Sequence, residues 1–224
     1  MPLIIILAEC GIELIPREIR DHPSIRKHLK EQNFASQLLD NALHHSAMVN
    51  LKDFEKRGRP DIAHNCLLNA LGSPLNKSGQ LIVYLHTVKN KIFKFNPEIN
   101  LTRNYNRFKG LTAKLLIESE VKANSLGLIS QFKGELKDLI KSYKSKKVMI
   151  FSSKGRFIAH HLELFQENLS KNYIGIIGGF QKGTFSNEIY TLSKEIVSIS
   201  NYSLDAWNVV NKIITFYEIT HNIS

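Results

Sequence analysis

The sequence predicts an α/β fold with a mostly parallel sheet flanked by helices, and three observations support this prediction. The run LIIILAE at residues 3–9 is almost continuously apolar, which is typical of a strand covered on both faces. Short apolar runs alternate with amphipathic segments along the chain, as in folds whose parallel strands are joined by helices. The amphipathic segment at residues 204–219 predicts a long helix that closes the fold.

Size and composition favour one compact domain that spans residues 1–224. The chain is 43% hydrophobic, enough to bury a core, and it contains no internal repeat or low-complexity linker. The two cysteines, Cys10 and Cys66, form neither a disulfide framework nor a C-x-x-C motif, which favours a reducing, cytoplasmic location. The first apolar run is shorter than the ~20 residues of a membrane span and lacks a signal peptide's basic region, so no membrane association is expected.

Helices are expected in the first half of the chain wherever apolar residues recur every three or four positions. Residues 23–33 and 38–48 have this spacing, with basic side chains on the polar side. Residues 61–73 carry a clearer apolar stripe, which includes Cys66, and Gly72 is a suitable end for this helix.

The middle of the chain is expected to form a hairpin followed by two helices. Residues 79–97 contain two apolar stretches separated by Lys89-Asn90, which predicts two strands joined by a tight turn. Residues 105–121 have helical spacing. The Lys-rich residues 132–147 favour a further helix, with positive charge near its C-terminus, where the helix dipole stabilises it.

Three short apolar runs in the last third predict strands, and each ends in small residues. These ends are SSKG (152–155), GGFQKG (178–183) and SISN (198–201). Because ligands bind beyond the carboxyl ends of parallel strands, the three ends would form a pocket walled by backbone N–H and C=O groups. Such a pocket suits an adenine edge or a ribose, although the pattern also fits ordinary strand-to-loop turns. A phosphate-binding loop is excluded because Gly183 is followed by Thr184-Phe185, without the required Lys and Ser/Thr.

The balance of charge favours a polyanionic partner. The formal net charge is +10 and the isoelectric point is near 9.5, which favours nucleic acid through counterion release. A lysine-rich surface that only solvates the protein is the alternative.

The motif KRGRPDIAH at residues 56–64 is a candidate RNA contact. Pro60 fixes the backbone between Arg59 and Asp61, and a guanidinium aimed by a carboxylate is a good clamp for a phosphate or a base. Asp61 also fits the N-cap of the helix that follows. Both roles can hold together, one for each carboxylate oxygen.

The motif LTRNYNRFKG at residues 101–110 is a second candidate RNA contact. Arg103 and Arg107 are four positions apart and would share a helix face, with Lys109 nearby, so an anionic partner would explain the like charges. Tyr105 and Phe108 could stack on splayed bases or pack inward. A solvated basic face is the alternative reading of the cations.

No metal site is expected. The pairs His44-His45 and His160-His161 lack the i,i+4 spacing and the accompanying cysteine or carboxylate set of a metal centre. Cys66 lies on an apolar stripe and is expected in the core.

Three blocks of sequence together resemble a known family. Residues 58–87, 103–116 and 178–204 are similar, in order, to the ribosomal small-subunit pseudouridine N1-methyltransferases, the nucleolar-essential-protein family of the SPOUT superfamily. The resemblance covers most of the chain. It implies a SPOUT-type α/β knot with a deep C-terminal trefoil knot at about residues 148–224, a small β-rich insertion, and S-adenosylmethionine as cofactor.

The resemblance also assigns roles to particular residues. Arg59 would contact the RNA loop and Asp61 would hold that arginine. The family forms homodimers, and apolar residues of the last helix would supply the interface or belong to the core: Ala206, Trp207, Val210, Ile213 and Ile214. The cofactor would be held by Gly178, Gly183, Ile196, Val197, Ser198, Ile199, Ser200 and Asn201.

The implied substrate is a pseudouridine in a hairpin loop of small-subunit (16S) ribosomal RNA, methylated at N1 during ribosome biogenesis. Asp61 is the nearest acidic candidate for catalysis, but its bond to Arg59 would lower its pKa, so an orienting role is expected. Two alternatives stay open: a non-catalytic RNA-binding ribosome assembly factor, and a SPOUT RNA methyltransferase specific for another base or for a ribose.

Overall fold

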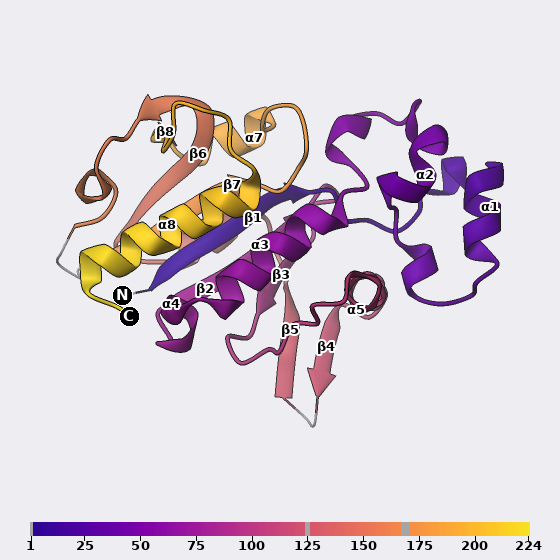
Figure 1. Cartoon of the computed structure of the whole chain (residues 1–224), viewed down its shortest axis with the longest axis horizontal. Coiled ribbons are helices and arrows are strands. Elements are labelled where there is room, and N and C mark those ends of the chain that lie inside the picture. The colour runs from indigo at the N-terminus through magenta and orange to yellow at the C-terminus, as the bar shows by residue number, and fades with distance from the viewer. Residues whose placement is uncertain (1, 124–125, 167–170) are drawn as a thin grey trace.

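The computed structural model describes residues 2–123, 126–166 and 171–224, and the strands described there form one eight-stranded sheet (Figure 1). The strand order is β4-β5-β3-β2-β1-β7-β6-β8. The strands are β1 (Leu3–Cys10), β2 (Leu81–Thr87), β3 (Ile92–Phe95), β4 (Glu120–Ala123), β5 (Leu126–Phe132), β6 (Lys146–Phe157), β7 (Asn172–Gly178) and β8 (Ile196–Ser198).

The central part of the sheet is parallel, which confirms the predicted fold class. Strand β1 pairs in parallel with β2 and β7, and β6 pairs in parallel with β7 and β8. Strands β3, β5 and β4 extend the sheet in antiparallel fashion at one edge. This antiparallel edge fits the expected β-rich insertion, and β2 and β3 form the predicted hairpin with Asn90 in a left-handed turn, φ 55°.

Helices cover both faces of the sheet. They are α1 (Pro23–Leu29), α2 (Asn41–Met48), α3 (Pro60–Gly72), α4 (Pro74–Lys77), α5 (Tyr105–Glu118), α6 (Leu136–Ser142), α7 (Asn187–Tyr190) and α8 (Ala206–His221). Single 3₁₀ turns lie at Arg17–Ile19, Ala35–Gln37, Phe54–Lys56 and His161–Glu163. Helices α3 and α8 lie side by side across one face, whereas α1 and α2 form a lobe beyond the end of β1 (Figure 1).

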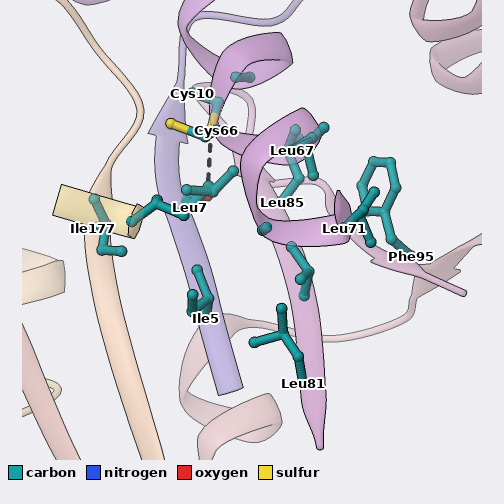
Figure 2. Close-up of a cluster of buried hydrophobic side chains, with 14 of the residues drawn as sticks. Ile5, Leu7, Cys10, Cys66, Leu67, Leu71, Leu81, Leu85, Phe95 and Ile177 are labelled. Carbon is teal, nitrogen blue, oxygen red and sulfur yellow. Dashed lines mark hydrogen bonds between the residues drawn. The ribbon is translucent and has the colours of Figure 1, made fainter. Parts of the chain in front are cut away.

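The core confirms that β1 is covered on both sides. Ile5 and Leu7 of β1 pack with Cys66 and Leu67 of α3, as Figure 2 shows. The alternate residues of β1 pack in a second cluster with Leu139 and other residues of α6. The described residues include no helix with the length and apolar character that a bilayer crossing requires.

Several predicted element boundaries are wrong. The helix expected at residues 132–147 is only α6, because β5 runs to Phe132 and β6 begins at Lys146. Helix α5 ends at Glu118, where Ser119 adopts a left-handed φ of 67° and β4 follows. The helices expected at residues 23–33 and 38–48 are the shorter α1 and α2, separated by a 3₁₀ turn.

Strand β6 does not stop at the SSKG segment as expected. It continues to Phe157, and Val197 of β8 pairs with both Phe151 and Arg156 of β6, so the intervening residues pass around Val197. Gly155 lies against that backbone: an added Cβ would be 2.5 Å from the nitrogen of Val197. The trefoil knot and the assignment of residues 1–224 to one domain stay predictions.

The last helix contributes mostly to the core of its own chain. Val210, Ile213 and Ile214 are 0–3% exposed. Their burial excludes these three residues from a subunit interface, so the core alternative is the correct one for them.

Candidate functional site

A cavity of about 460 Å³ opens at the carboxyl ends of β7 and β8, beside the middle of β6 and at the start of α8. The three small-residue segments predicted from the sequence all contribute to its wall. Ser152–Lys154 follow the first half of β6, Gly178 ends β7, and Val197–Ser200 end β8. The three segments therefore converge as expected, although the first lies within β6 and not at its end.

Most of the residues proposed to hold a cofactor line this cavity. Gly183 is one of them, and its φ of +100° is a conformation that L side chains rarely adopt. Two candidates lie outside the lining: Ile196, which packs against the core beside α6, and Asn201, which is exposed. The candidates that line the cavity are Gly178, Gly183, Val197, Ser198, Ile199 and Ser200.

Sequence reasoning missed the aromatic part of the wall. Phe180, Phe185 and Tyr190 come from the loop after β7 and from α7, and Trp207 comes from the first turn of α8. The signal that could have found Phe180 is its position inside GGFQKG, a segment already expected at the pocket. Trp207, expected at a subunit interface or in the core, is half-buried: it packs against the core and also lines the cavity.

The cavity is largely neutral. Among the described residues that line it, only Arg59, Lys154 and Asp205 are charged at neutral pH. The lining also contains serine hydroxyl groups, such as those of Ser152 and Ser198, among the apolar and aromatic side chains. This donor set suits a ligand that combines an aromatic ring with neutral polar groups.

Arg59 reaches the cavity from the other half of the molecule and is held by Asp61. Its Nε donates to Asp61 Oδ1 at 2.8 Å and its Nη2 donates to Oδ2 at 2.6 Å. The hydrogen bonding of its guanidinium to the Asp61 carboxylate is the main cause that raises the pKa of Arg59. The sequence correctly predicted an arginine aimed by this aspartate.

Asp61 is not the N-cap of α3, which corrects the capping alternative. Arg59 occupies the cap position and Pro60 is the first helical residue, so Asp61 lies within the first turn. Both of its carboxylate oxygens accept from Arg59. Its position near the positive end of the helix dipole is favourable for a carboxylate in any case.

Arg103 and Arg107 are both exposed, but they do not share a helix face. Helix α5 begins at Tyr105, and the side chain of its N-cap, Asn104, accepts from the backbone N–H of Arg107. Arg103 precedes that cap and belongs to the loop. The expected pairing on one face is therefore wrong, while both guanidinium groups stay accessible to an anion.

Lys109 points into the protein rather than toward a partner. Its side chain is 7% exposed, and its Nζ lies 3.0 Å from Asp40 Oδ2. Phe108 also packs inward, stacked on His64 at 4.3 Å between ring centroids, and Tyr105 donates its hydroxyl to Asp40. The burial of Lys109 contradicts its expected position on the RNA-facing surface.

His44 and His64 are held by contacts inside the protein. His44 is buried with its Nε2 2.9 Å from His28 Nδ1, and burial is the main cause that lowers the pKa of His44 to about 4. His64 bonds to the carbonyl oxygen of Thr102.

Within residues 2–123, 126–166 and 171–224, no group of three or more potential ligand side chains is placed to hold a metal ion. Burial raises the pKa of both cysteine thiols, that of Cys66 to about 12.

Comparisons with known proteins agree with this geometry. The family model described as EMG1/NEP1 methyltransferase matches residues 5–218. A Staphylothermus marinus protein named ribosomal RNA small subunit methyltransferase Nep1 is 39% identical over 225 residues, which cover 99% of this chain and 97% of the relative. A Thermococcus sibiricus protein of the same name is 40% identical over 219 residues, with 96% of each chain covered.

A solved structure is similar along almost the whole chain. The crystal structure of Archaeoglobus fulgidus Nep1 bound to S-adenosylhomocysteine superposes with a TM-score of 0.86 at 34% identity, and the match covers 98% of this chain and 99% of the other. The family indicated by the sequence resemblance is thus confirmed over the full length. The chain belongs to the EMG1/NEP1 methyltransferase family.

Proposed function

We propose that this protein transfers a methyl group from S-adenosylmethionine to N1 of a pseudouridine in a hairpin loop of small-subunit ribosomal RNA. The observation that carries the proposal is the largely neutral cavity at the ends of β7 and β8 and beside the middle of β6, with Arg59 at its wall. The Archaeoglobus relative is bound to S-adenosylhomocysteine, the molecule left when S-adenosylmethionine gives up its methyl group.

The residues of the cavity fit this cofactor. A volume of about 460 Å³ lies in the usual range for small-molecule sites. Adenosine needs neutral donors and acceptors, which Ser198, Ser200 and the backbone around Gly178 supply, and it needs an apolar surface for its ring, which Ile177 and Ile199 supply. The bound cofactor would provide an electrophilic methyl group on a sulfonium.

The protein's own contribution to the reaction is positioning and charge compensation. In the transfer, N1 of pseudouridine gains the methyl group as the sulfur–methyl bond breaks, and its proton passes to water, so negative charge develops on the base as that proton leaves. Arg59, oriented by two hydrogen bonds to Asp61, would stabilise this charge or hold the adjacent phosphate. Because both oxygens of Asp61 are engaged, we assign it the orienting role and no proton transfer.

The substrate surface extends from Arg59 to the start of α5. Arg103 and Arg107 are exposed cations there, and they would bind phosphates of the hairpin. Loop nucleotides can be splayed out of a hairpin and held by stacking and hydrogen bonds, which fits delivery of one base into a cavity. Under this surface, the buried Lys109 forms an ion pair with Asp40.

The proposal includes a cytoplasmic homodimer. Phe157, Leu162 and Ile219 are 46–56% exposed. They lie on β6, on the 3₁₀ turn at His161–Glu163 and on α8, and that turn packs against α8. An apolar surface of this kind favours self-association.

The test is methyl transfer from labelled S-adenosylmethionine to two synthetic hairpins that differ only in pseudouridine or uridine at the target position, with mass analysis of the digested RNA. Methyl at N1 of pseudouridine alone is the expected result. Tight hairpin binding without transfer would favour an assembly factor, and methylation of both hairpins would indicate another specificity.

Arg59→Ala is expected to lower the methylation rate by at least a hundredfold, because it removes a charged contact made near the reacting base. Lys144→Ala is the matched control. Lys144 is exposed just before β6, at the amino end of that strand and away from the cavity lining, and its replacement should leave the rate unchanged.

A further inference from the structure

The end of β1 is a junction between the segment that carries Arg59 and the loop that follows β7. Glu9 lies at this end, inside an irregularity of the pairing with β2 between Leu7 and Cys10. Its φ of 53° is left-handed, a conformation that is unfavourable for a glutamate and that is retained where the surroundings enforce it. A glycine would fit this backbone without strain, so the side chain of Glu9 requires an explanation.

The carboxylate of Glu9 binds both neighbouring segments. Its Oε2 accepts from Lys56 Nζ at 2.8 Å, and the backbone N–H of Ser186 donates to its two oxygens at 3.1 and 3.3 Å. The residue is 8% exposed, so water screens these contacts weakly. The backbone N–H of Glu9 donates to His86 Nδ1 at 3.2 Å, and the lowered pKa of His86, caused mainly by burial, favours the neutral ring that accepts this bond.

Lys56 extends the connection to the wall of the cavity. Its ammonium lies 4.9 Å from the ring centroid of Phe180, and its side chain passes beside Gly183. Both of these residues line the cavity. Lys56 is also separated from Arg59 by only two residues, so one side chain joins the Arg59 segment to the cofactor loop.

Backbone bonds at Gly11 strengthen the same junction. The N–H of Arg59 donates to the carbonyl oxygen of Gly11 at 3.1 Å, and the N–H of Gly11 donates to the carbonyl oxygen of Gly179 at 3.3 Å. Residues 9–11 therefore link the loop after β7 to the backbone of Arg59.

We propose that Glu9 and Lys56 are positioning residues that couple occupancy of the cavity to binding of RNA at Arg59. A ligand that orders Phe180 and Gly183 also orders Lys56, and through Glu9 and Gly11 it fixes the backbone of Arg59. Coupling between two sites is reciprocal, so RNA at Arg59 strengthens cofactor binding by the same factor. This inference rests on the proposed function, because it takes the cavity as the cofactor site and Arg59 as an RNA contact.

The test measures the affinity of the full-length protein for the pseudouridine hairpin with and without saturating S-adenosylhomocysteine. The wild type should bind the hairpin at least about fivefold more tightly when the cavity is filled. Lys56→Met keeps an unbranched apolar side chain beside Phe180 and removes the charge, and Glu9→Gln keeps an acceptor for Ser186. The coupling factor is the ratio of the two hairpin affinities. Each variant should reduce this factor to nearly one, whereas Lys56→Arg should keep it at the wild-type value.

Lys114→Met is the matched control, because Lys114 forms an exposed ion pair with Glu118 on α5, at 3.7 Å. It should leave the coupling factor unchanged. If Lys56 has only a structural role, Lys56→Met will lower the melting temperature and both single-ligand affinities, and the coupling factor will stay at its wild-type value. That result would overturn the inference. A wild type that binds each ligand alone without coupling would also overturn it.

A wild type that binds neither ligand would overturn the proposed function as well.

Discussion

The cavity and the charged surface beside it are built by opposite means. The cavity is formed by strand ends whose small residues leave mainly backbone and neutral side chains at the wall. The charged surface at residues 56–61 and 101–110 is formed by cations that divide into two groups. Arg59 and Arg107 face the site or the solvent, whereas Arg57 and Lys109 are buried against Glu13 and Asp40.

The difference shows what decides the role of a cation in this fold. Lys109 and Arg107 are two residues apart, yet one has a buried carboxylate within 3.0 Å and the other is exposed. The partner of Lys109 is Asp40, the N-cap of α2, which is distant in sequence but adjacent in the fold. The fold, more than the local sequence, therefore separates the cations that hold the surface together from those that face outward.

The largest expected effect comes from Lys109→Ala. The variant leaves the carboxylate of Asp40 buried without its cation, and breaking a buried pair in this way costs about 3–5 kcal/mol of unfolding free energy. Urea unfolding monitored by circular dichroism would measure it. A loss below about 1 kcal/mol would show that Lys109 belongs with the outward cations.

The cavity wall should be almost as sensitive, for a steric reason. In Gly155→Ala the new Cβ would lie 2.5 Å from backbone atoms of Val197, so strands β6 and β8 must move apart. We expect a loss of about 3 kcal/mol of unfolding free energy and loss of S-adenosylmethionine binding by calorimetry.

Gly72→Ala is the control for this variant. It adds the same methyl group at the end of α3, where nothing lies within 4 Å, and should stabilise the protein by about 0.5 kcal/mol. Equal stability of the two variants would refute the close approach of β6 to β8.

The sequence predicted the cavity better than the charged surface, and the reason is physical. Apolar runs that end in small residues indicated which three segments meet, so residues from 152–155, 178–183 and 198–201 could be assigned to one pocket, although the first segment lies within β6 and not at its end. The burial of Lys109 depends on Asp40, a long-range contact that no local pattern encodes. The prediction that Asp61 caps α3 is wrong for a local reason: Pro60 takes the first helical position, so the cap is at Arg59.

The support beneath the charged surface is expected to weaken in acid through His44. Its pKa is lowered to about 4 from an ordinary value of 6.5, mainly by burial and then by His28. Between these pH values the unfolded chain binds a proton that the folded chain does not, so this part of the stability is present above pH 6.5 and is lost as the pH falls toward 4.

We expect this loss to be roughly 2 kcal/mol. The measurement is the unfolding free energy from pH 7 to pH 4.5, compared with His44→Asn, which cannot bind the proton. Carboxylates titrate in both proteins, so the difference between the two profiles isolates His44. Parallel profiles would show that His44 does not contribute to the pH dependence.

The smallest effect on stability is expected for Arg107→Ala, within about 0.5 kcal/mol, because an exposed side chain is removed. Its effect on RNA should be specific. Loss of one phosphate contact lowers the slope of log K against log salt concentration by about one, which hairpin titrations at several salt concentrations would measure. An unchanged slope would remove Arg107 from the RNA-binding surface.

The position of β1 between β2 and β7 has a consequence for how the protein is made. The pair of β1 and β2 is complete once Thr87 has been synthesised, but the other edge of β1 stays unpaired until β7 emerges, more than eighty residues later. The cavity closes later still, because its wall needs β8 and the first turn of α8. Chains are made from the N-terminus, so a partly synthesised chain exposes an apolar strand edge and has no ligand site. A cofactor can therefore bind only after β8 and the first turn of α8 have been made, so cofactor binding reports that the whole sheet has assembled.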